Sequence, residues 1–263
     1  MKKNLYFSGV VKRENVLKNI ILDFFFGLSS YPRLLLEVFI RKNFGERYFR
    51  LSSVLTVVGI LAVLPPLITK VAAWFSQAPA RHGFYEEQPP AFWPHYLTWY
   101  LFIAGFLYVS WIRRKEIKRN PSVYDFAKYS FYSGELNPLF FKIKLPGRTT
   151  DIRIVETLFE PAPFFIAGLV LWLLGQKLGI LLTICSLAYA ISYVGAYTSG
   201  DNFVMDKIDE MICNEELEKA FVDDAGDDAT RGFRFIGRKP NDPDMRRKMM
   251  PLMTAAEEVI QAR

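Results

Sequence analysis

Four apolar stretches constrain this chain of 263 residues more than any other feature of its sequence. A helix crosses a bilayer with about 20 consecutive, mostly apolar residues. Uncharged runs of this kind are typical of membrane helices and are hard to reconcile with the buried helices of a soluble protein. The four stretches contain no Asp, Glu, Lys or Arg and cover residues 51–68, 91–112, 161–174 and 178–197.

Short connections arrange the four stretches in two pairs. Only Gly175-Gln176-Lys177 separates the third from the fourth, which predicts a tight helical hairpin. Pro65-Pro66 near the end of the first stretch predicts a kink or an unwound last turn. The predicted fold is an all-α integral membrane protein with four transmembrane helices in two hairpins, amphipathic N-terminal helices and small cytoplasmic α(+β) elements.

The distribution of basic residues predicts the orientation. Residues 1–50 and residues 113–160 hold ten Lys or Arg each, whereas the two hairpin loops together hold three. Basic residues concentrate on the cytoplasmic side of membrane proteins. Both termini and the middle loop are therefore expected in the cytoplasm, in what we interpret as a bacterial inner membrane. Trp99 and Tyr100 are expected at the outer boundary as aromatic anchors.

This topology divides the chain into five regions. The last of them carries a net charge of −5, against +11 for the rest of the chain. The regions are an interfacial N-terminal region (1–50), a first transmembrane hairpin (51–112), a cytoplasmic loop (113–158), a second hairpin (159–197) and an acidic cytoplasmic tail (198–263).

An amphipathic helix is predicted over residues 14–30, and Pro32 opens a second amphipathic stretch. Large apolar residues beside basic ones favour a helix that lies on an anionic cytoplasmic leaflet. The same face would equally suit packing on the middle loop or on a neighbouring subunit. The apolar residues on one face of the first helix are Leu17, Ile20, Ile21, Phe24 and Leu28.

The middle loop and the tail should contain short elements. A helix is expected from Pro121-Ser122, and residues 139–147 and 150–157 suggest a strand pair, with a helix as the alternative for the latter. In the tail, residues 202–221 predict a helix, and a last short helix is expected near 251–263. The tail helix should carry near one face Val204, Ile208, Met211 and Phe221.

The sharpest local cluster of charge is Arg153, Glu156 and Glu160, before and at the start of the third stretch. A helix would place the two carboxylates on one face, with Arg153 a turn away. One interpretation is a helix-start carboxylate that is paired with a basic neighbour. The other is a proton- or cation-sensing interface or pore mouth.

A second candidate is a face of small residues in the fourth stretch. Ala188, Ser192 and Ala196 follow at four-residue spacing, which lets helices approach closely. This face should pack on the third stretch or on another subunit.

Signatures of catalysis are missing from the sequence. The two histidines, His82 and His95, have no cysteine nearby, so no metal site and no cofactor is expected. Residues 223–228 hold four aspartates without EF-hand spacing, which favours a solvated linker over a calcium site. Because the basic residues flank the membrane stretches, direct nucleic-acid binding is not expected either.

These observations favour a membrane anchor or scaffold subunit over an enzyme. Its partners would be the lipid bilayer and other protein subunits of a complex, for example of the secretion or DNA-transfer type, and a homo-oligomer would fit as well. An oligomeric channel or pore is the alternative function. A membrane enzyme that acts on lipid, dependent on Glu156 or His95, is the third.

Overall fold

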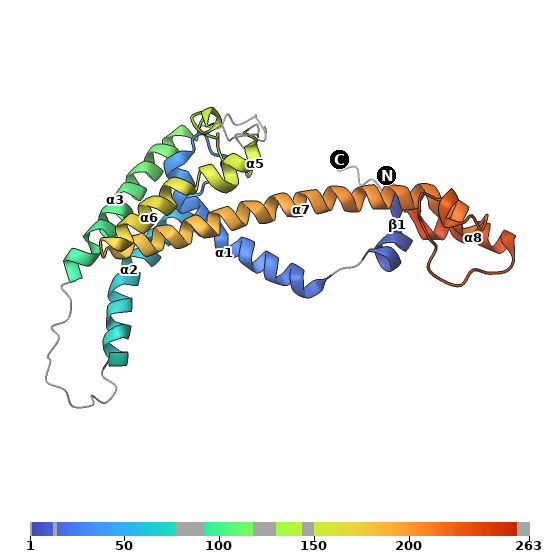
Figure 1. The fold of residues 1–263 in the computed structure, drawn as a ribbon, viewed down its shortest axis with the longest axis horizontal. Coiled ribbons are helices and arrows are strands. Elements are labelled where there is room, and N and C mark those ends of the chain that lie inside the picture. Colours follow the sequence, from blue (N-terminus) through green and yellow to red (C-terminus); the bar gives the residue numbers. More distant parts are fainter. Residues whose placement is uncertain (1, 13–14, 77–91, 118–129, 144–149, 257–263) are drawn as a thin grey trace. The chain divides into compact units, whose positions relative to one another are not determined.

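The computed structural model of the chain describes residues 2–12, 15–76, 92–117, 130–143 and 150–256. It is almost entirely helical (Figure 1), which confirms the helical fold class. In chain order the elements are β1 (Lys2–Asn4), η1 (Phe7–Val11), α1 (Val16–Ile40), α2 (Leu51–Ser76), α3 (Phe92–Glu116), η2 (Phe140–Lys142), α5 (Ile152–Ile154), η3 (Val155–Phe159), α6 (Ala162–Leu173), α7 (Lys177–Phe221), η4 (Asp227–Ala229), α8 (Pro243–Met253) and β2 (Thr254–Ala256).

Three of the described helical stretches are long and apolar enough to cross a membrane, namely Leu51–Val71, Ile152–Leu173 and Lys177–Phe221. They agree with a membrane protein. Helix α3, which covers the second predicted span, has 25 residues but is less apolar, because Trp, Tyr and His side chains interrupt its aliphatic ones. The second predicted span, residues 91–112, therefore stays a prediction, and so does the total of four spans.

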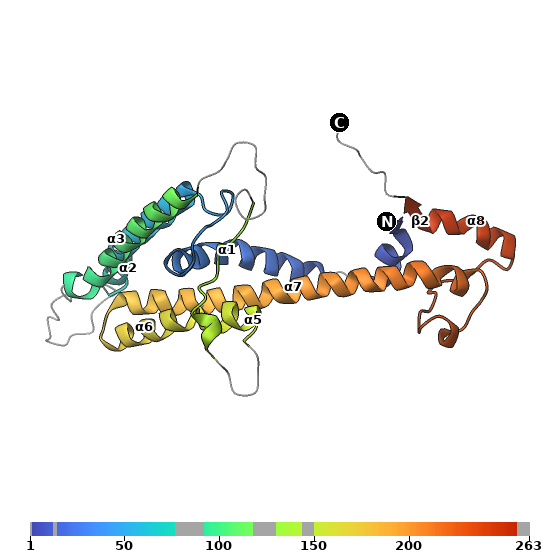
Figure 2. The same cartoon turned by 90° about the horizontal axis from the view of Figure 1, so that it is seen from above.

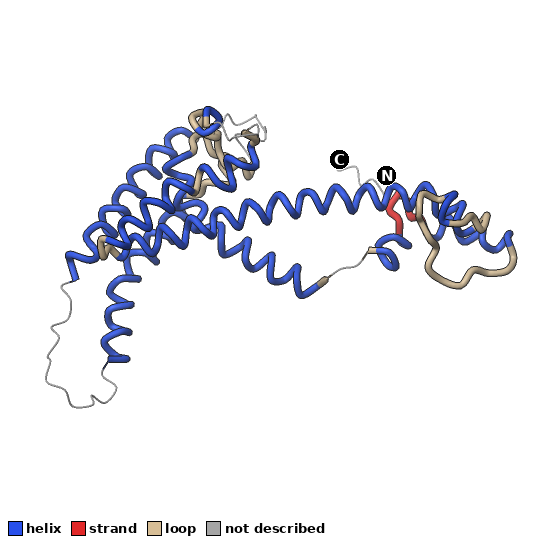
Figure 3. The backbone as a smooth tube through the Cα atoms, viewed as in Figure 1, coloured by secondary structure: helices blue, strands red, loops and turns tan. Residues whose placement is uncertain are grey.

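The chain separates into two compact units. The helical unit comprises residues 22–195, and the terminal unit comprises residues 1–21 together with residues 196–263. The beginning of the chain therefore folds with the tail. In the terminal unit β1 pairs antiparallel with β2, with Asn4 opposite Thr254 (Figure 3).

An apolar core holds the terminal unit together. Cys213, Leu217 and Phe221 follow at four-residue spacing on α7, so they share one helical face, and Tyr6 and Phe7 pack against them. The prediction that Phe221 and Val204 lie near one face was therefore wrong. Phe221 lies in the core, whereas Val204 is exposed.

The last helix lies earlier than predicted. Helix α8 spans residues 243–253, where Asp242 accepts a hydrogen bond from the backbone N–H of Asp244 at 3.0 Å and Pro243 occupies the first turn. Residues 254–256 form β2, and residues 257–263 lie outside the described part.

Ion pairs fix the segment that was predicted as a solvated linker. Asp224 has a left-handed backbone (φ 53°) and accepts hydrogen bonds from Lys239 at 2.7 Å and from Arg246. These two cations hold the pKa of Asp224 below its ordinary value. The predicted linker therefore includes one positioned carboxylate.

Helix α2 continues through both of its prolines. Pro65 and Pro66 have no N–H, so the carbonyl oxygens of Leu61 and Ala62 lose their partners within the helix. The predicted unwound last turn is nevertheless absent, because α2 extends to Ser76.

Two aromatic side chains of α3 replace the missing donors. The indole Nε1 of Trp99 donates to the oxygen of Leu61 at 2.8 Å, and the hydroxyl of Tyr100 donates to the oxygen of Ala62 at 3.3 Å. Both orphaned carbonyls are thus satisfied by the helix that packs on α2 (Figure 2). Trp99 is only 5% exposed, so its indole packs within the protein, and its position at the outer boundary stays a prediction.

Other described segments resolve the alternatives left by the sequence. Residues 140–142 form the 3₁₀ turn η2 and residues 152–159 are helical, so the predicted strand pair was wrong in these parts. Helix α1 runs without interruption through Pro32 to Ile40. The helix expected from Pro121-Ser122 lies outside the described residues.

Candidate functional site

A cluster of charged side chains is buried inside the helical unit. Its centre is Arg41, which directly follows α1 and is fully buried, together with Glu160 at the start of α6. The Arg41 Nε atom donates to the two carboxylate oxygens of Glu160 at 3.0 and 3.2 Å, and its Nη2 atom also contacts Glu160. This bidentate geometry is the strong form of an arginine–carboxylate pair.

Three further groups complete the coordination of Arg41. Nη2 donates to Glu156 at 3.1 Å and to the hydroxyl of Tyr189 at 3.0 Å, while Nη1 donates to Ser133 at 2.9 Å. Tyr189 in turn donates to Glu160 at 2.5 Å. Arg41 thus joins α1, the 130–135 segment, η3 and α7.

A second carboxylate, Glu37, lies one turn before Arg41 and is also fully buried. It accepts a hydrogen bond from Tyr193 at 2.9 Å and one from Tyr48, and it pairs with Arg33 at 3.4 Å. Arg33 also donates to Ser192 at 3.2 Å and lies 4.1 Å from the ring centre of Tyr193. We call the following residues the buried charge cluster: Arg33, Glu37, Arg41, Tyr48, Glu156, Glu160, Tyr189 and Tyr193.

The surroundings keep Arg41 charged. Burial by itself lowers the pKa of Arg41, but Tyr189, Glu160 and the other acidic groups around it outweigh burial and hold the pKa above its ordinary value. Burial followed by the charge of Glu37 raises the pKa of Tyr48, which keeps its hydroxyl proton available for donation. Arg41 is therefore a buried cation whose Nε, Nη1 and Nη2 atoms all donate hydrogen bonds.

The cluster lies well inside the apolar part of α7. Tyr189 follows Lys177, the first residue of the helix, by twelve positions, which corresponds to about 18 Å along the axis. Ionisable groups at such positions are expensive and mark either function or tight pairing. The contacts around Arg41 show tight pairing.

The structure brings together two of the three residues predicted as an interface or pore mouth. Glu156 and Glu160 share Arg41 as their cation. Arg153 lies on α5 with an exposed side chain. Glu160 itself is 0% exposed.

The three residues of the predicted small-residue face differ in their surroundings, and its packing on another subunit stays a prediction. Ser192 is buried beside Arg33, whereas Ala196 is exposed and Ala188 is half-buried. The closest approach of α6 and α7 lies at two glycines instead. A Cβ atom on Gly179 would lie 2.5 Å from the carbonyl oxygen of Gly168.

The turn between α6 and α7 contacts the beginning of α3. Nδ1 of His95 lies 3.2 Å from the carbonyl oxygen of Gly175, and the hydroxyl of Thr98 donates to Gln176 at 2.8 Å. His95 therefore belongs to a different hydrogen-bonded group from Glu156. His82 lies outside the described residues.

Among the described residues, no group of three His, Cys, Asp or Glu side chains is arranged to hold a metal ion. Cys185 and Cys213 are both free thiols, which agrees with their predicted separation.

The sequence analysis missed Glu37 and Arg41 as members of this cluster. A signal existed, because Arg33, Glu37 and Arg41 follow at four-residue spacing within the apolar stretch PRLLLEVFIR. A lone carboxylate among such residues needs a partner. Arg41 had instead been counted only as one of the basic residues that determine orientation.

Comparison of the chain with protein-family models, curated proteins and solved structures finds no match.

Proposed function

We propose that the chain is a polytopic membrane anchor that recruits a protein partner to a membrane complex. The observation that most supports this proposal is the composition of α7. Its residues 178–197 are apolar, and residues 198–221 of the same unbroken helix are rich in charge yet display an apolar stripe. One helix thus supplies both a membrane segment and a surface for docking.

The stripe consists of Val204, Ile208 and Met211, which are 55%, 38% and 42% exposed. Their spacing of four and then three residues is that of a coiled-coil seam. Charged residues such as Asp209 border the stripe. An amphipathic helix of a partner protein suits a stripe of this form.

The proposed placement is a bacterial inner membrane with both termini in the cytoplasm. The asymmetry of Lys and Arg supports it. The contacts of His95 with Gly175 and of Thr98 with Gln176 add support, because they join the beginning of α3 to the α6–α7 turn, as two hairpins with their tips on one side require.

Site-specific photo-crosslinking in cells tests the proposal. A photoreactive amino acid at Ile208 should yield one discrete product with a partner protein, whereas one at Asn202, which is exposed and roughly 120° away around the helix, should not. Ile208→Asp should abolish copurification of the same partner. A chain that crosslinks to nothing, or equally from both positions, would contradict the proposal.

The two alternative functions have less support from the site. Glu160 is fully buried against Arg41, so it does not line a passage in this conformation. Selective conductance in liposomes that Glu160→Gln abolishes would establish the channel function instead. Because Glu156 and His95 belong to separate groups, they offer no shared catalytic centre for a lipid-modifying enzyme.

A further inference from the structure

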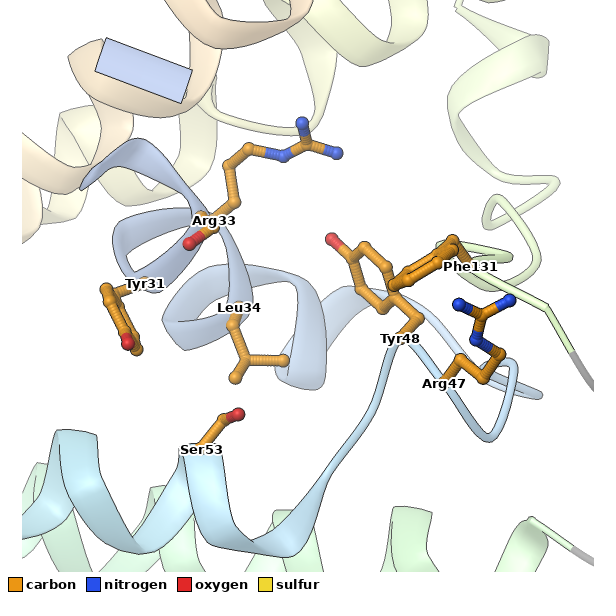
Figure 4. A pocket seen from close by; sticks show the side chains of 8 residues that line it. Tyr31, Arg33, Leu34, Arg47, Tyr48, Ser53 and Phe131 are labelled. Atoms are coloured by element: carbon orange, nitrogen blue, oxygen red, sulfur yellow. The ribbon is translucent and has the colours of Figure 1, made fainter. Parts of the chain in front are cut away.

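A polar pocket of about 260 Å³ lies where α1 meets the start of α2 (Figure 4). Among the described residues, its lining provides two guanidinium groups and four hydroxyl groups but no carboxylate. The hydroxyls of Ser30 and Tyr48 already donate to Gly27 and Glu37, so the hydroxyls that suit a phosphate group are those of Tyr31 and Ser53. The lining residues are Ser30, Tyr31, Arg33, Leu34, Arg47, Tyr48, Ser53 and Phe131.

The two arginines of this pocket differ in how they are engaged. Arg33 is occupied by Glu37 and Ser192 in the buried charge cluster. Arg47 is exposed and lies 4.3 Å from the ring centre of Phe131, and in the described part of the chain no carboxylate pairs with it. In Figure 4 Arg47 and Phe131 lie on the same side of the pocket. The charge of Arg47 is thus available to an anion.

An apolar groove of about 240 Å³ adjoins the polar pocket. Tyr31 lines both, and on α2 the lining continues from Ser53 in the pocket to Val57 and Ile60 in the groove. On α1, Arg33 and Leu34 of the pocket lie in sequence between Pro32 and Leu35 of the groove. The groove is lined by Leu28, Tyr31, Pro32, Leu35, Val57, Ile60, Leu61, Leu181 and Cys185.

The order of these two sites along α2 follows the expected profile of a membrane. Ser53 lies in the first turn of α2, and Ile60 lies seven residues further on, about 10 Å deeper along the axis. The polar pocket is therefore at the end of a candidate membrane span, and the groove follows that span inward.

We propose that the pocket and the groove together bind one anionic phospholipid of the surrounding bilayer. The phosphate contacts Arg47 and the hydroxyl of Ser53, and an acyl chain lies along Val57, Ile60 and Leu181. The proposal rests on the membrane placement of α2, but it is independent of the docking stripe on α7.

The lining also favours a headgroup with net negative charge. The ammonium group of a zwitterionic lipid would need a carboxylate, and the described residues that line the pocket present none. Phosphatidylglycerol is thus expected to bind better than phosphatidylethanolamine with the same acyl chains.

Native mass spectrometry of the full chain in mild detergent, titrated with each of the two lipids, tests this site. The unmodified chain should bind one phosphatidylglycerol. Arg47→Gln should weaken that binding about tenfold or more, because a charge-assisted contact to the phosphate is lost. Ile60→Trp should weaken it as well, because the indole fills the groove.

Matched controls make the result specific. Arg50→Gln removes an exposed arginine that does not line the pocket, and Leu55→Trp changes a residue of α2 that is 56% exposed, like Ile60, but lies outside the groove. Both should retain binding within about twofold, a free-energy difference well below that of one lost contact. Helical content by circular dichroism confirms that the variants fold.

Several outcomes would overturn the proposal. Equal losses for Arg47→Gln and Arg50→Gln would indicate general attraction of anions, and equal binding of the two lipids would remove the headgroup preference. Displacement of the lipid by millimolar inorganic phosphate would show that the groove contributes nothing. A dimer that Ile60→Trp dissociates, without any bound lipid, would assign the groove to a second copy of the chain. None of these results bears on crosslinking at Ile208, so the two proposals fail separately.

Discussion

The helical unit keeps its ion pairs inside, whereas the terminal unit keeps several of its ion pairs at the surface. Arg41 and Glu160 are fully buried among α1, α6 and α7. In the terminal unit the side chains of Asp224 and Arg231 are 56% and 57% exposed in their ion pairs, and the core is apolar. A unit surrounded by lipid has no water to satisfy polar groups, so they must find partners within the protein. Exposed pairs in water contribute little by comparison.

The largest expected effect follows from removing the central cation of the buried charge cluster. Arg41→Ala leaves Glu156 and Glu160 buried without their shared partner and should lower the free energy of unfolding by about 3–5 kcal/mol. Chemical unfolding in detergent measures this loss, and Lys42→Ala, at an exposed position, is the control. Adding Glu160→Gln should recover part of the loss, and the absence of recovery would show that the loss comes from packing alone.

A substitution that creates a cavity in the core of the terminal unit should cause the next largest loss of stability. Leu217 is fully buried, and Leu217→Ala should cost about 2–5 kcal/mol. Hydrogen exchange should accelerate in residues 213–256 and stay unchanged in α2 and α3. The control is Leu252→Ala on α8, where the side chain is 75% exposed. Faster exchange throughout the chain would contradict the division into two units.

Removing the indole N–H of Trp99, which replaces the hydrogen bond that Pro65 cannot make, should lower the free energy of unfolding by a smaller amount. Trp99→Phe keeps an aromatic ring but leaves the carbonyl of Leu61 without its hydrogen bond, which should cost about 1–3 kcal/mol in the same unfolding measurement. Trp111→Phe, at a position that is 56% exposed, should change stability little. If the two substitutions were equivalent, the compensation of Pro65 by Trp99 would be unimportant.

The smallest effect is expected at Asp224 and should depend on pH. Because the pKa of Asp224 is lowered in the folded state, its contribution is present above the ordinary value and is lost as the pH falls through the folded pKa. At pH 7, Asp224→Asn should accelerate hydrogen exchange in α8 by a factor of a few. Near pH 2 the variant and the unmodified chain should converge, and a difference that persists there would exclude this origin.

Local pattern was sufficient to predict several features. Apolar runs without charge predicted the helical stretches that α2, α6 and the first half of α7 occupy, because their length and composition are properties of each segment alone. The spacing of Glu156 and Glu160 also correctly placed both carboxylates on one side of a helical segment. The composition of the tail predicted the charged half of α7.

Contacts between residues that are distant in the sequence could not be predicted from local sequence patterns. Arg41 and Glu160 are 119 residues apart, and Trp99 and Leu61 are 38 apart. Nothing in the local spacing of any of these residues specifies the other. Likewise, the packing of Tyr6 and Phe7 against Cys213 joins the two ends of the chain, although the sequence analysis had placed them in separate regions.

The sequence by itself determined which segments are apolar enough to leave water and where the charges between them lie. Only the tertiary structure decided how the polar groups inside those segments are satisfied. The physical reason is that hydrophobic transfer depends on the composition of a segment, whereas a hydrogen bond or ion pair depends on two groups meeting at about 3 Å. Arg41 shows the difference, because its sequence neighbours indicate a membrane boundary but its contacts make it the centre of a buried charge cluster.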